Sequence, residues 1–260
     1  MDRGAFLRWL DEQQLPRSET YACPYLPDRD ARQFGFRSDR FDAELYHDLM
    51  DRGFRRSGAV FYAMDCPGCR ACVPLRVPVA TFRPSRSQRR TLRKNADVRV
   101  EVGPPCFREE SHALYLRYLR HQHPGTPADE SVESFRAALY DRVVDSLEAR
   151  YFVDDRLIGV SLLDVCSRSL SAVYHFFEPD ERHRRIGVLS ALHEIEHARQ
   201  RQIPYYYLGY WIEGAPTMQY KAEYGPHELL RDGVWIRDAA AGGADGIAPS
   251  RGDETDATGD

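Results

Sequence analysis

The sequence predicts an α+β fold in which a mixed β-sheet is flanked by helices and preceded by a cysteine-containing region. An alternating strand at residues 98–102 is followed by two amphipathic segments of helix length. Three strand-like segments separated by turn residues come next and indicate an antiparallel meander. A charged loop, a helix and an aromatic strand then complete the element order of the N-acetyltransferase-like fold.

The elements of this fold can be placed by periodicity and by turn residues. We expect a strand at 98–102, helices at 108–121 and 131–148, strands at 149–153, 157–165 and 170–177, a charged loop at 178–185, a helix from 187 to about 200, and strands at 205–211 and 235–236.

The residues before this fold also contain regular elements. We expect a helix at 42–52, a turn at 55–58, a strand at 59–63, a strand at 73–79 and a helix that begins after Ser85. Ser85 and Gln88 have the spacing of a capping box. Prolines in the strand at 73–79 favour an edge position. The predicted division is a Cys-cluster and basic-helix region at 1–97, an acetyltransferase-like domain at 98–238 and a disordered tail at 239–260.

The composition is that of a globular protein. The 260 residues are 42% hydrophobic and 29% charged. The first residues lack the apolar stretch of a signal peptide, and no apolar run approaches the ~20 residues of a membrane helix. We therefore expect a cytoplasmic protein with no membrane partner. The net charge of −4 conceals a basic segment at 76–99 that a polyanion would meet.

Three cysteines at two-residue gaps are the clearest candidate metal ligands. The thiolates of Cys66, Cys69 and Cys72 can converge within a tight turn, and Cys23 is the best candidate for a fourth ligand. The spacing does not separate zinc from an iron–sulfur cluster, and buried thiols without a metal are the alternative.

Four arginines share one face of the helix predicted after Ser85. Arg86, Arg89, Arg90 and Arg93, which we call the arginine face, follow the i, i+3, i+4, i+7 pattern. No acidic residue lies between positions 83 and 94, and guanidinium groups bind phosphates in a bidentate manner. The pattern favours binding of RNA or another polyanion over a merely solvated helix face.

The helix at 187–200 contains two motifs that need weighing. His193 and His197 match the H-E-x-x-H pattern of zinc proteases, but the apolar stripe of the helix should turn both side chains to solvent. A polar helix face is the preferred interpretation. At the start of the helix, Leu189 stands where a coenzyme A loop has Gly or Ala, so no coenzyme A is expected.

The strand at 205–211 is unusually aromatic. It is either core plus an exposed edge or the wall of a cleft, in which Gly209 would allow a close backbone approach. Lys221 follows in an expected loop and could meet a phosphate or a carboxylate.

Five segments together resemble a known family. The chain is similar to the bacterial branch of the arginyl-tRNA–protein transferases, the aspartate/glutamate leucyltransferases, over about residues 18–237. The segments are residues 23–26 (CPYL), 66–74 (CPGCRACVP), 85–90 (SRSQRR), 207–212 (YLGYWI) and 218–222 (MQYKA).

The resemblance implies transfer of leucine from leucyl-tRNA to an N-terminal Asp or Glu, which marks the acceptor protein for N-degron degradation. The implied partners are leucyl-tRNA and such proteins, with no DNA. Eukaryotic relatives hold a cluster or zinc through a Cys-x-x-Cys and an adjacent Cys-Cys pair. Here Leu26 and Ala71 replace one cysteine of each.

The resemblance also defines candidate site residues. An apolar pocket for leucine would be walled by Tyr207, Tyr210 and Trp211, and the arginine face would hold tRNA phosphates. Lys221 or an arginine of residues 83–94 would bind the acceptor's acidic side chain, and His175 and Glu178 are candidates for proton transfer. The expected catalytic residues are His175, Glu178, Tyr210 and Lys221.

Three other functions remain open at this point. They are arginyl transfer by the same chemistry, N-acetyl transfer to a small molecule, and a non-catalytic module, stapled by a metal, that binds RNA or senses redox state.

Overall fold

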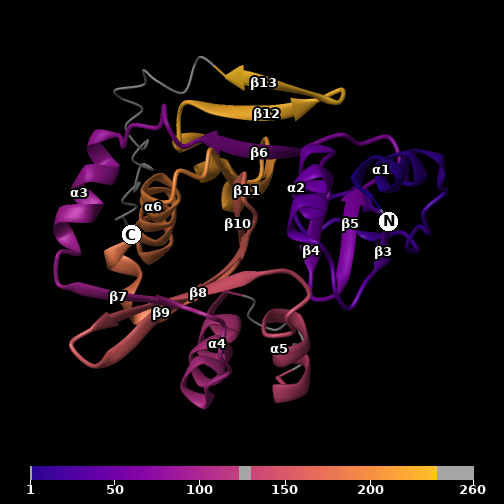
Figure 1. Ribbon diagram of the computed structural model, residues 1–260. Coiled ribbons are helices and arrows are strands. Elements are labelled where there is room, and N and C mark those ends of the chain that lie inside the picture. Colours follow the sequence, from indigo (N-terminus) through magenta and orange to yellow (C-terminus); the bar gives the residue numbers. More distant parts are fainter. Residues whose placement is uncertain (1, 123–129, 239–260) are drawn as a thin grey trace, which may run out of the picture.

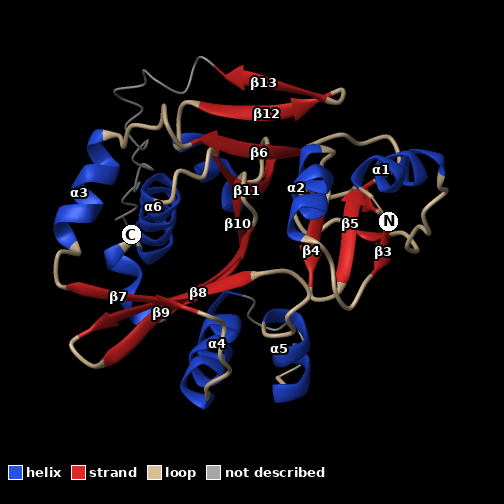
Figure 2. Cartoon of the chain, in the orientation of Figure 1, coloured by secondary structure: helices blue, strands red, loops and turns tan. Residues whose placement is uncertain are grey.

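The computed structural model describes residues 2–122 and 130–238, and an eight-stranded sheet is its largest element (Figure 1, Figure 2). All neighbouring strands are antiparallel except the parallel pair β10–β11. In spatial order the strands are β13 (Val234–Asp238), β12 (His227–Arg231), β6 (Cys72–Pro78), β11 (Tyr205–Ile212), β10 (Ser169–Phe177), β9 (Arg156–Val165), β8 (Ser146–Val153) and β7 (Val98–Gly103).

Helices cover both faces of this sheet (Figure 1). One face carries α4 (Glu109–Gln122) and α5 (Val132–Leu139), and the other carries α3 (Arg86–Lys94) and α6 (Ile186–Gln200). The α6 side contains a core in which Leu192 and Ile195 pack with residues of β6, β10 and β11. The opposite core includes Leu114 and Phe135. The α+β fold with a mixed sheet flanked by helices is therefore confirmed.

A smaller layer precedes the sheet in sequence. It contains α1 (Arg3–Glu12), α2 (Ala43–Asp51) and a three-stranded sheet of β3 (Gln33–Arg37), β5 (Val60–Met64) and β4 (Arg55–Ser57), besides the two-stranded pair β1 (Tyr21–Ala22) and β2 (Asp30–Ala31). Its core is aromatic and continues into the large sheet through Tyr207.

The prediction that residues 73–79 form an edge strand is wrong, because β6 lies between β12 and β11. The two prolines fit this interior position for a local reason. β12 pairs with β6 only at Leu75 and Arg76, so neither Pro74 nor Pro78 has to donate to that ladder. Through β6, residues before position 97 belong to the large sheet, and the division of the chain at that position stays a prediction.

The helix predicted at 131–148 is also too long. α5 ends at Leu139, and β8 begins at Ser146. Val143 and Val144 continue the apolar pattern, but they are buried in the core of the smaller layer. Periodicity alone did not distinguish the two environments. The predicted disordered tail, 239–260, lies outside the described residues.

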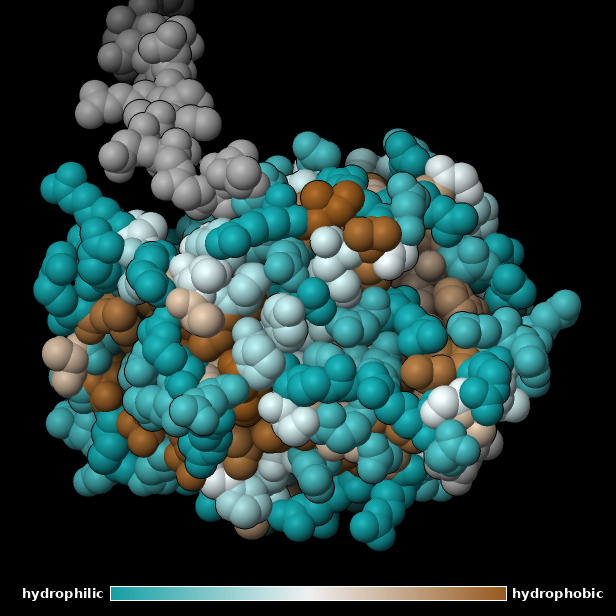
Figure 3. Space-filling model, turned by 45° about the horizontal axis from the view of Figure 1, so that its top comes forward, coloured by the Kyte–Doolittle hydropathy of each residue, from teal (hydrophilic) through white to brown (hydrophobic). Residues whose placement is uncertain are grey.

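Two further features concern the distribution of hydrophobic residues on the surface and the apolar character of the helices. On the face that Figure 3 draws, hydrophobic residues lie in separate groups among hydrophilic ones. No helix in the described part of the chain has the length and apolar character needed to cross a membrane.

Candidate active site

The sheet opens between β10 and β11. These strands pair only from Ser169 to Ser171, opposite Tyr205 to Tyr207. Beyond that point β10 pairs with β9 alone, and β11 pairs with β6. Both strands have a register shift at the opening, so their free edges leave polar backbone groups for other partners.

Arg55 of β4 fills part of this opening. Its Nη1 donates to Ser171 Oγ at 3.0 Å, and its Nη2 donates to the carbonyl oxygen of Ala172. Gly209 has φ of +82°, and a Cβ added there would lie 3.5 Å from Arg55 Nε. The close approach expected at Gly209 is therefore made by a guanidinium group of the same chain.

Lys221 lies beside the same opening. It belongs to the 3-10 turn η2 (Tyr220–Glu223), which follows the short helix α7 (Pro216–Gln219), and its Nζ donates to the carbonyl oxygen of Tyr210 at 2.7 Å. Burial, and to a lesser degree the charge of Arg55, lowers the pKa of Lys221 to about 7. The lysine expected in a loop is thus buried, and with a pKa of about 7 it is only partly protonated near neutral pH.

The three aromatic residues expected to form a leucine pocket do not pack together. Tyr207 is buried in the core of the smaller layer, and its hydroxyl hydrogen-bonds to Asp51. Tyr210 donates its hydroxyl to the carbonyl oxygen of Gly53 at 2.7 Å. Trp211 packs against the core on the α6 side. Only Tyr210 adjoins Lys221.

His175 lies further along β10, away from the pairing with β11, and Glu178 directly follows that strand. His175 Nδ1 is 2.9 Å from Ser161 Oγ, and burial lowers the pKa of His175 to about 4, so its imidazole is neutral. The carboxylate of Glu178 accepts from Arg117 at 2.8 and 3.0 Å. No hydrogen bond or ion pair in the described chain joins either residue to Lys221.

The arginine face lies on α3, next to α6 (Figure 1). Its four arginines are exposed, and no carboxylate of the described residues forms an ion pair with any of them. The capping box of Ser85 and Gln88 is present as predicted and fixes the start of the helix. Arg185, which precedes α6, donates to Ser87 Oγ at 2.7 Å and adds a further cation beside the face.

Comparison with known proteins identifies the family. The model for the N terminus of arginine-tRNA-protein transferases matches residues 21–90, and the model for the C terminus matches residues 110–231. The chain belongs to the arginine-tRNA-protein transferase family. An aspartate/glutamate leucyltransferase from Marinobacter nauticus is 41% identical over 215 residues, which cover 82% of this chain and 91% of that protein. The leucyltransferase of Halorhodospira halophila is 41% identical over 226 residues, 85% of this chain and 95% of its own.

These relatives confirm the resemblance read from the sequence and the prediction of an aminoacyltransferase enzyme. Among solved structures, the C-terminal domain of a putative lysylphosphatidylglycerol synthetase from Agrobacterium fabrum gives a TM-score of 0.44 at 11% identity, covering 70% of this chain and 68% of its own. FemX gives 0.43 at 9% identity, covering 82% and 83%. Both structural similarities are distant.

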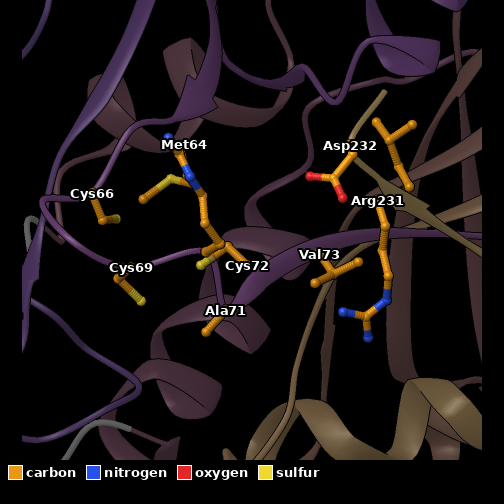
Figure 4. A pocket seen from close by; sticks show the side chains of 10 residues that line it. Met64, Cys66, Cys69, Ala71, Cys72, Val73, Arg231 and Asp232 are labelled. Carbon is orange, nitrogen blue, oxygen red and sulfur yellow. The ribbon is translucent and has the colours of Figure 1, made fainter. Parts of the chain in front are cut away.

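Three of the six cysteines of this transferase line one cavity. It measures about 230 Å³, and Cys66, Cys69 and Cys72 lie along it with Arg231 and Asp232 opposite (Figure 4). Burial, together with the neighbouring thiols of Cys66, Cys23 and Cys69, raises the pKa of Cys72 to about 12.

The spacing of these cysteines predicts a site for zinc or an iron–sulfur cluster. Within residues 2–122 and 130–238, no three His, Cys, Asp or Glu side chains converge on a position for a metal ion. The thiols are neighbours without forming a ligand set, so we assign no step of the reaction to a metal. The metal site stays a prediction.

The prediction that His193 and His197 of this transferase point to solvent is wrong. Both are half-buried, and they line a cavity of about 180 Å³ between α6 and strands β7 and β8. The apolar stripe of α6 predicted that its polar side faces solvent. In the structure, β7 and β8 lie next to that polar side and partly cover it. Burial lowers the pKa of both imidazoles, while the buried Glu194 between them hydrogen-bonds to Tyr206.

Arg55 is a residue of this opening that the sequence pattern does not single out. Residues 55–58 were expected as a turn, whereas Arg55–Ser57 form the strand β4. Nothing in the local pattern distinguishes Arg55 from Arg56, although the two guanidinium groups have different partners.

Proposed function

We propose that this transferase moves leucine from leucyl-tRNA to the N-terminal Asp or Glu of proteins. The observation that carries the proposal is the 41% identity to an aspartate/glutamate leucyltransferase over 91% of that protein's length. The match spans both parts of the chain, so it includes the arginine face and the open edge between β10 and β11.

The reaction is an aminolysis of an ester. The neutral α-amine of the acceptor attacks the carbonyl carbon that joins leucine to the tRNA 3′ oxygen, and an amide bond forms as the ester bond breaks. The amine loses one proton and the tRNA oxygen takes one up. An α-amine with a pKa of about 7.7–8.0 is partly neutral near pH 7, so positioning of the two substrates supplies much of the rate.

The arginine face and the two candidates for proton transfer, His175 and Glu178, have different surroundings. The arginine face is exposed and unpaired, which suits the phosphates of a tRNA acceptor stem. His175 is neutral and Glu178 is held by Arg117, so neither is free to act as a strong base or as a proton donor at neutral pH. We therefore propose a mechanism that depends on positioning, in which neither His175 nor Glu178 serves as an essential base.

The same proposal places the enzyme in the cytoplasm, where charged tRNA is present, and makes its product a substrate for degradation. The donor is leucyl-tRNA rather than arginyl-tRNA, because the relatives at 41% identity are named leucyltransferases.

A transfer assay tests the proposal. The purified protein is incubated with tRNA charged with labelled leucine or labelled arginine, and with a peptide that begins with Asp. Labelled leucine should appear in the peptide. Transfer of arginine instead would overturn the donor assignment, and acetylation from acetyl-CoA without aminoacyl transfer would overturn the proposed function.

A further inference from the structure

Two buried cations at the opening of the sheet have no counter-ion. Arg55 and Lys221 are each 8% exposed. Within the described parts of the chain, neither forms an ion pair with a carboxylate. Their hydrogen-bond acceptors are all neutral. They are the oxygens of Ser171, Ala172 and Tyr210 and the sulfur of Met50, which lies 3.8 Å from Arg55 Nη1.

Other buried cations of the chain are neutralised. Arg56, next to Arg55, is also 8% exposed, but it forms a bidentate pair with Asp164 at 2.6 and 2.9 Å. Arg76 is 8% exposed and pairs with Asp51 and Glu228 at 2.7 Å each. Burial of an unpaired charge is costly, and an additional like charge nearby increases that cost. The unpaired state of Arg55 and Lys221 therefore stands out from the rest of the chain.

The two cations contact neighbouring residues of β11. The Arg55 guanidinium lies against Gly209, and Lys221 Nζ contacts the carbonyl oxygen of the next residue, Tyr210. The charge of Arg55 also lowers the pKa of Lys221, which requires the groups to be close. Lys221 uses one of its three ammonium hydrogens in the described structure, so the remaining donors can bind an anion.

We infer that Arg55 and Lys221 together bind the side-chain carboxylate of the acceptor's N-terminal Asp or Glu. This inference rests on the proposed function and assigns its acceptor specificity to two residues. One carboxylate offers two oxygens to a guanidinium and an ammonium group, and its charge compensates the pair. The neutral amides Asn and Gln have the same shape but lack the charge, so they leave both cations unpaired.

The location favours a carboxylate over a tRNA phosphate. A phosphate belongs to a continuous backbone and needs an open surface, such as the exposed arginine face on α3. Arg55 and Lys221 are each only 8% exposed, which suits the single side chain of a chain end better than a continuous backbone. Binding there would also hold the acceptor's α-amine close to the opening between β10 and β11.

The test compares peptides that begin with Asp, Glu, Asn or Gln and are otherwise identical. Transfer of labelled leucine is measured with the unchanged protein, Arg55→Met, Lys221→Met and the control Arg37→Gln, whose side chain is exposed on β3. Each of the two Met variants should lower kcat/KM for the Asp peptide roughly 10- to 100-fold, the loss expected for hydrogen bonds to a charged group. The value for the Asn peptide should change much less, so the preference for Asp collapses, while Arg37→Gln keeps it.

An equal loss on the Asp and Asn peptides would overturn the inference, because it would reveal a purely structural role. Should Arg55→Met fail to fold, Lys221→Met and Arg55→Lys carry the same test, since either must lower the Asp preference. Arg55→Lys retains a charge but loses the planar fork of the guanidinium group.

Two binding measurements separate this inference from the proposed function. Calorimetry with uncharged peptides should show tighter binding of the Asp peptide than of the Asn peptide, even if the protein transfers no leucine. Equal binding would overturn the inference without bearing on the reaction. Filter binding of leucyl-tRNA should be the same for Arg55→Met and the unchanged protein. A weakened affinity would assign the cations to a phosphate and overturn it.

Discussion

The arginine face makes a quantitative prediction about tRNA binding. In the proposed function Arg86, Arg89, Arg90 and Arg93 contact phosphates of leucyl-tRNA, and replacing all four with Gln removes these contacts. The helix should survive the change, because the four side chains are exposed and Gln is a good helix former. The capping box of the helix is untouched.

The magnitude follows from counterion release. Each phosphate contact contributes about 0.9 to the slope of log affinity against log salt concentration, so four contacts amount to a slope change of about 3–4. Between 50 and 200 mM salt, the unchanged protein should therefore lose on the order of 100-fold more affinity than the variant. Every guanidinium of the face is available for such contacts, since none is ion-paired within the described residues.

Filter binding of leucyl-tRNA over a series of KCl concentrations measures the slope directly. A control variant with Arg37→Gln and Arg120→Gln alters two exposed arginines that already pair with Asp39 and Glu130, so its slope should match that of the unchanged protein. If the fourfold variant has the same slope as the unchanged protein, the assignment is refuted and the arginine face is merely solvated.

The remaining predictions concern stability, each measured by urea unfolding. Arg56→Met leaves the buried Asp164 unpaired and should cost about 3–5 kcal/mol, whereas a loss below about 1 kcal/mol would contradict a buried ion pair. Gly35→Ala puts a Cβ 2.0 Å from a backbone carbonyl oxygen of β5 and should cost about 2–3 kcal/mol, while Gly103→Ala, with open space around it, should change little. The folded state holds His175 at a pKa of about 4, below its ordinary 6.5, so the free energy of unfolding should fall as the pH drops from about 6.5 to 4. His175→Gln should reduce that slope, and an unchanged pH profile would contradict the assignment.

The sequence predicted the elements whose patterns are local. The alternation of residues 98–102, the meander and the α6 segment all reflect side-chain periodicity on one face, which neighbouring residues alone determine. The capping box of Ser85 was found for the same reason, because its two hydrogen bonds lie within four residues.

Features that depend on distant partners were misread or missed. The prolines of β6 indicated an edge, because the short pairing with β12 is invisible in the sequence. The end of α5 was misplaced because Val143 and Val144 keep an apolar pattern while they contact a different core. Tyr207 and Trp211 looked like one wall, although they belong to different cores.

The pair Arg55 and Arg56 shows why a charged site is hardest to find before the fold is known. The residues are adjacent, identical and equally buried, and no local pattern separates them. Arg56 is neutralised by Asp164, which lies 108 positions further along the chain, whereas Arg55 hydrogen-bonds only to neutral acceptors among the described residues. A buried cation becomes a candidate for ligand recognition when the folded chain places no carboxylate beside it. Arg55 is therefore identified by the groups that three separate segments bring around it.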